Sequence, residues 1–476
     1  MGVRKVKSGI EGLDEVIGGG FPKGSLILLA GRPGTGKTVF SMRFLVEGCR
    51  VGEPGVYVSF TESKKTLIEN VSRHIGVDLG RLVGEGKLKI LDFTAVREKG
   101  VSAVMNAILD EIRAVKAKRL VIDSFSAMAQ AFGSPIDVRI MVHLLLSRIV
   151  RGMGCTSLVI EEVPIGKSEI GFGVEEFVAD GIIVLRAGYL NDRLFRDLEL
   201  IKLRGVRLGE PKLAFTLEGG FKAFTPLKPK PVREPKRFQP IPDPPGRYST
   251  GSKDLDEALG DGVAKGSTIL LELDEKVSTP IYHLLAAPMV ANFMFQGRGV
   301  VIIPSSGVDP QLIRRRLQAY GGTEEEWKSY MRILTISVAE PTEFTNVAVI
   351  GRKDWREDFD RAFKIGEELM AETGQPTLSI ISVDTLITLY GERACEEILN
   401  VGATEVRKSK ALLLAILKAG RRGLAVRLSP IADVYLRLTR EHGCILTYGI
   451  RPRTGLYAVE TDVSKGYPLP KLTPIV

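Results

Sequence analysis

The chain has 476 residues, room for two domains of roughly 200 residues each, and its 44% hydrophobic and 26% charged residues are typical of a folded protein rather than a disordered one. Its four cysteines are dispersed without any C-x-x-C spacing, which argues against a zinc site and a disulfide framework. No apolar stretch approaches the roughly 18 residues of a membrane span, so we expect a cytoplasmic protein.

The first informative element is a glycine-rich loop between an expected strand and an expected helix. The apolar run 26–30 predicts a buried parallel strand, and the run that begins at position 39 predicts a helix. The loop between them fits the pattern G-x-x-x-x-G-K-[ST], whose glycines let backbone N–H groups turn toward phosphate oxygens. The predicted nucleotide-binding residues are Gly31, Arg32, Pro33, Gly34, Thr35, Gly36, Lys37, Thr38 and Val39.

This pattern assigns separate tasks to two side chains. Lys37 would reach the β and γ phosphates, and the Thr38 hydroxyl would hold Mg²⁺. The sequence therefore predicts that the chain binds ATP together with Mg²⁺.

Strands and helices alternate through the rest of the first 225 residues. The strands are expected at 55–60, 87–91, 119–122, 156–160 and 181–185, and the helices at 64–75, 102–115 and 137–151. This order predicts an α/β fold with a doubly wound, mainly parallel sheet. The strand over 119–122 runs into Asp123, which we predict to be the second magnesium-holding residue, the carboxylate of a Walker B element.

A proline-rich segment over 226–247 follows the first domain, 1–225. Its eight prolines preclude a regular helix or a central strand, so we expect a semi-rigid, extended linker. The segment carries six basic and two acidic residues, a net of +4 within a chain of net charge +9. A solvated connector is favoured over a contact with an anionic partner or nucleic acid.

The remainder, 248–476, contains a second copy of the first domain. Ser8-Gly9, Leu13-Asp14-Glu15 and Lys23-Gly24-Ser25 recur at one ungapped offset, which carries Lys37 onto Thr279 and Thr38 onto Pro280. Asp274 and Glu275 would repel a triphosphate, so we expect no P-loop nucleotide site in this copy. The strand that ends near Asp384 resembles the one that ends at Asp123, and the order of elements predicts the same α/β fold.

The first domain resembles the KaiC branch of the RecA superfamily of ATPases. The resemblance covers roughly residues 4–226, and its other motifs are Gly18-Gly19-Gly20-Phe21-Pro22-Lys23-Gly24-Ser25, Phe60-Thr61-Glu62, Glu175–Gly181 and Lys202-Leu203-Arg204-Gly205. The second domain, which lacks the P-loop residues, adds a weaker resemblance to archaeal KaiC-like proteins and gas-vesicle regulators. The resemblance implies two tandem RecA-like domains and ring formation, a hexamer by family analogy.

The same resemblance implies roles for three more residues. Glu62 matches the glutamate that activates the attacking water, and Thr61 stands where KaiC proteins usually have a second glutamate, which implies slow hydrolysis. Lys202 and Arg204 match the pair that reaches across a subunit interface to the neighbour's γ-phosphate. Glu176-Phe177 replaces the phosphorylated Ser-Thr pair of the clock proteins, so a circadian role is not expected.

Three functions remain open. The favoured one is a ring-forming, Mg-dependent ATPase that switches contacts with a protein partner, whose identity the sequence does not give. The second is a recombinase-like protein that binds single-stranded DNA through loops near 127–136 and 162–173, which are poor in basic residues. The third is an ATP-binding scaffold with negligible turnover.

Overall fold

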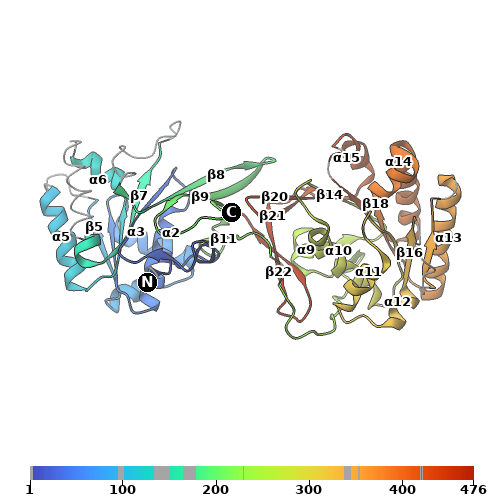
Figure 1. Ribbon diagram of the computed structural model, residues 1–476, viewed down its shortest axis with the longest axis horizontal. Coiled ribbons are helices and arrows are strands. Elements are labelled where there is room, and N and C mark those ends of the chain that lie inside the picture. The colour runs from blue at the N-terminus through green and yellow to red at the C-terminus, as the bar shows by residue number, and fades with distance from the viewer. Residues whose placement is uncertain are drawn as a thin grey trace. The chain divides into compact units, whose positions relative to one another are not determined.

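The computed structural model describes residues 4–94, 101–132, 149–164, 178–228, 230–336, 345–351, 354–418, 420 and 422–476. Packing divides the chain into two compact units, called here the first unit and the second unit (Figure 1). The first comprises Met1–Pro226, His442–Cys444 and Pro474–Val476, and the second comprises Leu227–Glu441 and Ile445–Thr473.

The first unit alternates strands with helices, as the sequence predicts. Its helices are α1 (Leu13–Val16), α2 (Lys37–Arg50), α3 (Lys64–Ile75), α4 (Leu79–Gly84), α5 (Val101–Ala114) and α6 (Phe125–Phe132). Its strands are β1 (Lys5–Val6), β2 (Phe21–Pro22), β3 (Leu26–Gly31), β4 (Gly55–Ser59), β5 (Leu88–Asp92), β6 (Arg119–Asp123), β7 (Thr156–Glu162), β8 (Gly181–Leu190), β9 (Arg193–Leu203), β10 (Lys212–Thr216) and β11 (Lys222–Ala223). Most of the expected helix over 137–151 lies outside the described residues.

The main sheet of the first unit is parallel around its centre. The described strands lie in the order β11-β10-β9-β8-β3-β7-β6-β4-β5, and those from β8 to β5 pair in parallel. All six residues of β3 are buried, because a central parallel strand is covered on both faces. The carboxyl ends of β3, β4, β6 and β7 therefore meet at one edge of the sheet.

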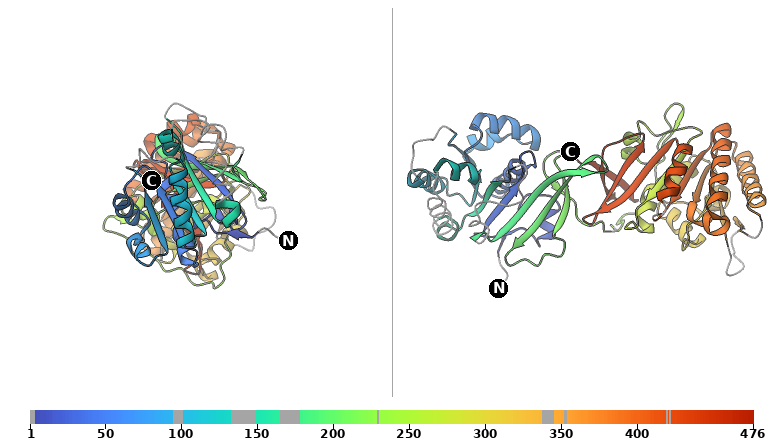
Figure 2. Two further views of the ribbon diagram at one scale, coloured as in Figure 1. Left: turned by 90° about the vertical axis from the view of Figure 1, so that its left-hand side faces the viewer. Right: turned by 90° about the horizontal axis from the view of Figure 1, so that it is seen from above.

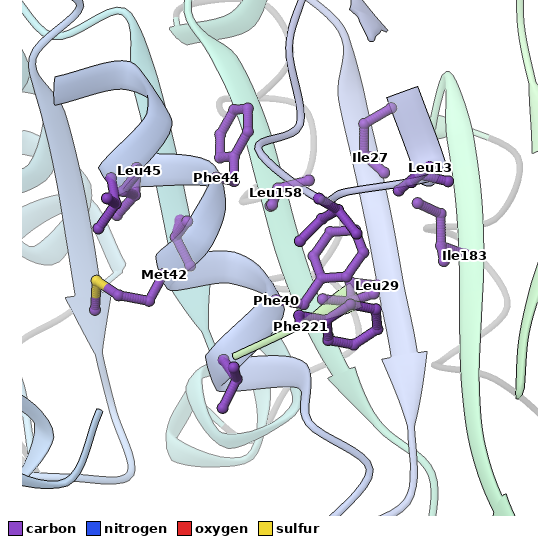
Figure 3. Packing of buried hydrophobic residues seen from close by; sticks show 14 of the residues in the cluster. Leu13, Ile27, Leu29, Phe40, Met42, Phe44, Leu45, Leu158, Ile183 and Phe221 are labelled. Carbon is purple, nitrogen blue, oxygen red and sulfur yellow. The ribbon is translucent and has the colours of Figure 1, made fainter. Parts of the chain in front are cut away.

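Helices cover both faces of this sheet, which makes it doubly wound. Residues of α2 and α3 share one buried cluster with alternate residues of the central strands, and residues of α5 and α6 share the other. On the α2 face, Phe40 packs edge-to-face on Phe221 at a centroid distance of 5.0 Å, beside Leu29 of β3 (Figure 3). This packing fixes the start of α2 beside the end of β3.

The second unit repeats the arrangement with longer helices. Its helices, one of them 3₁₀, are α9 (Lys253–Ala258), α10 (Thr279–Met294), α11 (Pro310–Gln318), α12 (Glu324–Tyr330), α13 (Trp355–Thr373), α14 (Val383–Ser409), α15 (Arg422–Leu428) and η2 (Ser429–Ile431). Its strands are β12 (Arg247–Tyr248), β13 (Val263–Ala264), β14 (Thr268–Leu273), β15 (Val300–Ile303), β16 (Met331–Thr335), β17 (Val347–Val349), β18 (Leu378–Ser382), β19 (Leu412–Leu417), β20 (Val434–Glu441), β21 (Cys444–Arg451), β22 (Tyr457–Asp462) and β23 (Leu469–Pro474).

The central strands of the two sheets follow one order. In the second unit the described strands run β17-β16-β15-β18-β19-β14-β20-β21-β22-β23, so β14, β19, β18 and β15 stand where β3, β7, β6 and β4 stand in the first. These central pairs are parallel as well. The expected α/β class with two mainly parallel sheets is confirmed.

The proline-rich segment differs in part from the semi-rigid, solvated linker that the sequence predicts. Its backbone is irregular over most of its length, but residues from Leu227 onward belong to the second unit. Phe238 is buried beside Tyr320 and Tyr467, and Arg298 forms an ion pair of 2.5 Å with Asp243. Prolines prevent regular secondary structure, yet the apolar and charged residues between them still find partners in the unit.

Among the described residues, no helix combines the length and the hydrophobicity that crossing a bilayer requires. All four cysteines are buried.

Candidate nucleotide site

The glycine-rich loop lies at the carboxyl edge of the first sheet, between β3 and α2. Gly36 precedes α2 with φ of 96°, a left-handed conformation that favours glycine. A Cβ atom on Gly31 would lie 2.7 Å from the carbonyl oxygen of Leu185, so only glycine fits there. These two positions let the loop turn tightly into the helix, which directs the first backbone N–H groups of α2 toward the loop.

Lys37 is buried inside this loop. Its ammonium donates hydrogen bonds to the carbonyl oxygens of Gly31 at 2.9 Å and Arg32 at 3.0 Å. Burial lowers the pKa of Lys37, while the carboxylates of Glu162, Asp123 and Glu161 act in the opposite direction. The amine therefore stands inside the loop and close to several carboxylates.

Asp123 and Thr38 meet beside the loop. The Thr38 hydroxyl donates a hydrogen bond of 3.1 Å to Oδ2 of Asp123, although 85 residues separate the two in the sequence. The Tyr57 hydroxyl donates to the same oxygen. Burial raises the pKa of Asp123, and the hydrogen bonds from Tyr57 and Thr38 lower it.

These groups fit a magnesium nucleotide. A hydroxyl and a carboxylate supply the oxygen ligands that Mg²⁺ prefers, and they lie next to a helix start and a lysine that suit a phosphate. The residues that the sequence singles out around positions 31–39 and 123 are thus brought together in one place.

Glu62 follows the neighbouring strand. The Phe60 amide donates to the carbonyl oxygen of Asp123 at 2.7 Å, and the backbone of Glu62 is held by the Ser59 side chain. The Glu62 side chain itself is exposed. It lies at the edge of the sheet where a water-activating carboxylate is expected.

Two further groups at this edge were not assigned to the site from the sequence. Glu161 and Glu162 end β7, and Glu162 pairs in register with Gly31 at the end of β3. An apolar run that ends in acidic residues is the same signal that marks Asp123, so it could have identified this pair. Tyr57, buried in the middle of β4, carries no such signal.

Lys202 and Arg204 lie at the opposite edge of the sheet. In the register of β8 and β9, Gly181 at the start of β8 pairs with Leu203, and Gly181 also pairs with Ile27 at the start of β3. Strand β3 spans about 13 Å from Ile27 to Gly31, since strands rise about 3.3 Å per residue. Neither residue is brought to the P-loop of its own unit.

Asp180 connects Arg204 to β3. Its carboxylate accepts a hydrogen bond of 3.0 Å from the Leu26 amide and forms an ion pair of 3.3 Å with the Arg204 guanidinium. The carbonyl oxygen of Asp180 also accepts from the Arg204 amide.

The corresponding edge of the second unit lacks a phosphate cradle. The stretch from Leu273 to Pro280 contains no glycine, and none of its residues has a positive φ. Glu272, at the end of β14, is buried and accepts a hydrogen bond of 2.6 Å from Tyr435. Glu272 also forms an ion pair of 3.5 Å with Arg437, so both groups at this edge are already paired with each other.

The carboxylate that we expect to hold magnesium has no counterpart in the second unit, although the sequence pattern that ends at Asp384 suggests that one is kept. Val121 packs with α2, and Ile380 packs with α10 at the matching place in the second sheet. Two residues further along each strand stand Asp123 and Ser382, whereas Asp384 lies in the first turn of α14. Ser382 is thus the counterpart of Asp123, and Asp384 is not.

The loops considered for DNA are largely outside the described residues. These cover only 127–132 of the first loop, where α6 contains no basic residue, and 162–164 of the second. Glu175–Phe177, which include the position of the missing phosphorylation pair, also lie outside.

Comparison with known proteins agrees with this site. Residues 6–221 match the family model "ATPase: KaiC", and residues 237–324 match "GvpD basic region 2". The circadian clock oscillator protein KaiC of Thermostichus vulcanus is 35% identical over 276 residues, 56% of this chain and 52% of that protein. The circadian clock oscillator protein KaiC of Synechococcus elongatus is 36% identical over 282 residues, which again are 56% of this chain and 52% of that protein.

A solved structure is also similar. The KaiC-like protein PH0186 from Pyrococcus horikoshii is 37% identical, and the match covers 47% of this chain and 100% of that one, with a TM-score of 0.43. The present chain spans about half the length of the clock proteins that it matches.

Proposed function

We propose that the first unit of this chain, a KaiC-like member of the RecA superfamily of ATPases, binds and hydrolyses MgATP in a ring of identical subunits. Nucleotide state would then switch the contacts of the ring with a protein partner. The second unit binds no nucleotide through a P-loop in this proposal.

The observation that carries the proposal is the cluster of Lys37, Thr38 and Asp123 at one edge of the sheet. A bound Mg²⁺ would neutralise charge on the phosphates. Thr38 and Asp123 would hold the ion, and Lys37 would exchange the carbonyl oxygens of its loop for phosphate oxygens. Glu62 would accept a proton from the attacking water as the general base.

The positions of Lys202 and Arg204 support action on a neighbouring subunit. Both lie at the amino edge of the sheet, away from the P-loop of the same chain. Two cations on a strand can stabilise charge on a transferred phosphoryl group only if that group comes to them. Ring assembly would bring the next subunit's nucleotide within reach.

A mixing experiment tests this directly. Arg204→Ala keeps an intact P-loop, and Lys37→Ala keeps an intact arginine, so each protein alone should release little phosphate from ATP. In a mixture, some subunit interfaces combine the intact P-loop of the Arg204→Ala variant with the intact Arg204 of the Lys37→Ala variant. We expect the mixture to recover a substantial part of the wild-type rate.

Two controls make the mixing result interpretable. Gel filtration with ATP should give Arg204→Ala the same assembled species as the wild type, and nucleotide titration should give it nearly the same affinity. Absence of recovery, with mixed assemblies present, would rule out action between subunits. Tight ATP binding by the wild type without phosphate release would instead favour the ATP-binding scaffold. Strong stimulation of ATP turnover by single-stranded DNA would favour the recombinase-like function.

A further inference from the structure

We propose that the second unit binds a small, mainly apolar, uncharged molecule with a hydrogen-bonding group, in a cavity of about 350 Å³ between β18, α13 and α14. Ligand sites in proteins commonly have volumes of about 300–1,000 Å³, mostly apolar walls and a few polar groups. The cavity is on the α13 and α14 face of the sheet, opposite α10, so it is separate from the degenerate P-loop.

Strand β18 forms the floor of this cavity and is partly exposed, whereas the corresponding strand of the first unit, β6, is buried. In the first sheet, Leu120 and Ile122 of β6 are completely buried on the corresponding face. Their counterparts on β18 are Ser379 and Ile381, which are both partly exposed and line the cavity. The same central strand thus has a sealed face in one unit and an accessible face in the other.

The helix above the floor packs loosely. In the first unit, α5 buries five apolar side chains to 3% exposure or less, Val104, Met105, Ile108, Leu109 and Ile112. In the second unit, α13 fully buries Leu369 alone among its apolar residues, and Trp355, Phe359 and Phe363 line the cavity instead. Helices α13 and α14 run side by side over this face (Figures 1 and 2).

Two glycines leave room in the helical walls. Gly366 of α13 and Gly402 of α14 both line the cavity. A Cβ atom on Gly366 would meet nothing within 4 Å, and one on Gly402 would only reach Leu413 at 3.7 Å. Larger residues could therefore occupy these positions without a clash, and they would fill the cavity.

The polar groups around the cavity define the class of ligand. The Ser379 hydroxyl comes from the floor, and no described residue forms a hydrogen bond with it. At one side the Tyr390 hydroxyl donates a bond of 2.8 Å to the buried Asp358 and retains acceptor capacity. Glu367 and Glu405 at the cavity outnumber Lys408, which is already paired with Glu405 at 2.7 Å. These charges disfavour an anion, whereas the hydroxyls suit a neutral polar group.

The chain contains its own reporter for binding. Of its two tryptophans, Trp355 lines the cavity and Trp327 is buried in the cluster on the other face of the sheet. An aromatic probe in the cavity should accept excitation energy from Trp355.

The test uses two probes with nearly the same aromatic body. N-phenyl-1-naphthylamine is neutral and has one N–H group, and 1-anilinonaphthalene-8-sulfonate adds a negative charge. The full-length protein should bind the neutral probe saturably, with transfer from tryptophan, and should bind the sulfonate at least tenfold more weakly. Absence of saturable binding of the neutral probe would overturn the proposal.

Cavity-filling variants locate the probe. Gly402→Leu should weaken binding of the neutral probe at least tenfold, while Val401→Leu, at the exposed neighbouring position of the same helix, should leave it unchanged. Gly366→Leu provides a second filling variant from the opposite wall, in case the first impairs folding. Unchanged affinity in a folded filling variant would show that the probe binds elsewhere and would contradict the proposal.

Discussion

The carboxyl edges of the two sheets share their strand order and differ in chemistry. In the first unit, two glycines, a lysine, a hydroxyl and a carboxylate converge where β3, β6 and β7 end. In the second, the equivalent edge has no glycine between Leu273 and Pro280, a buried Glu272 and Ser382 in place of the carboxylate. The comparison shows that the order of strands determines where a nucleotide site can form, and that a few residues at the strand ends determine whether it forms.

The largest difference should appear at the two lysines of these loops. Lys37→Ala removes the buried ammonium from the cradle, and we expect phosphate release from ATP to fall by roughly 10²–10³-fold. Lys276→Ala, in the corresponding stretch of the second unit, should leave the rate within about twofold, since that stretch lacks a glycine-rich turn. Phosphate-release assays on both variants make the comparison. Equal losses would show that the second edge also contributes to turnover.

The next comparison concerns the strand ends Asp123 and Ser382. Asp123→Asn keeps the shape but removes the charge, and it should raise the Mg²⁺ concentration needed for half-maximal ATP turnover by about 100-fold. Ser382→Ala should have no effect on this value. A Mg²⁺ titration of each variant at fixed ATP measures the difference. A normal Mg²⁺ requirement in Asp123→Asn would remove this residue from the metal site.

Acid should destabilise the second unit through His283, the counterpart of Ser41 in the first. Burial lowers the pKa of His283 to about 4, and Arg316 and Lys418 act in the same direction. Between pH 6.5 and 4 the unfolded chain therefore binds a proton that the folded chain rejects, so stability falls as the pH decreases. Allowing for partial exposure, the loss should reach about 2 kcal/mol at pH 4.

Tryptophan fluorescence can measure this loss in the intact chain, because both tryptophans lie in the second unit. Urea unfolding at pH 7 and at pH 4 to 5 should show a smaller decrease in His283→Gln than in the wild type. An identical decrease in both proteins would assign the acid sensitivity to other groups.

The smallest effect is expected at Tyr57, for which the second unit has Ile302 at the matching register position. Tyr57→Phe deletes only the hydroxyl that orients Asp123, so half-maximal Mg²⁺ should increase about tenfold while ATP affinity without metal stays the same. Nucleotide titrations with and without Mg²⁺ separate these two quantities. A loss of metal-free ATP affinity would point to a general disturbance of the loop.

The sequence predicts those features that depend on local pattern. Apolar runs locate β3, β4 and β6 to within a residue or two, and α3 occupies the expected range 64–75, with Ser63 capping its start and Gly76 ending it. The glycine-rich loop follows from its motif and Asp123 from an apolar run that ends in a carboxylate, and the structure places Thr38 of the loop beside Asp123.

The remaining features depend on register and packing, which the sequence does not display. Asp384 resembles Asp123 in the sequence pattern, but its backbone already belongs to a helix. Ser382 is identified as the counterpart only because Ile380, two residues earlier, packs where Val121 packs in the first sheet. Phe238 lies among prolines that suggest a free connector, yet its ring finds a buried aromatic cluster. The cavity depends on which side chains and glycines of α13, α14 and β18 face one another, and that arrangement becomes visible only in the folded structure.

In the ring that we propose, the ion pair between Asp180 and Arg204 would have a consequence for communication between subunits. To approach a phosphate on the next subunit, the guanidinium would have to leave a carboxylate that also holds the Leu26 amide at the beginning of β3. The far end of that same strand leads into the glycine-rich loop that we propose to bind phosphate. Occupancy of one nucleotide site would thereby change the anchoring of the strand that carries the next, so that neighbouring copies would sense each other through a single shared side chain.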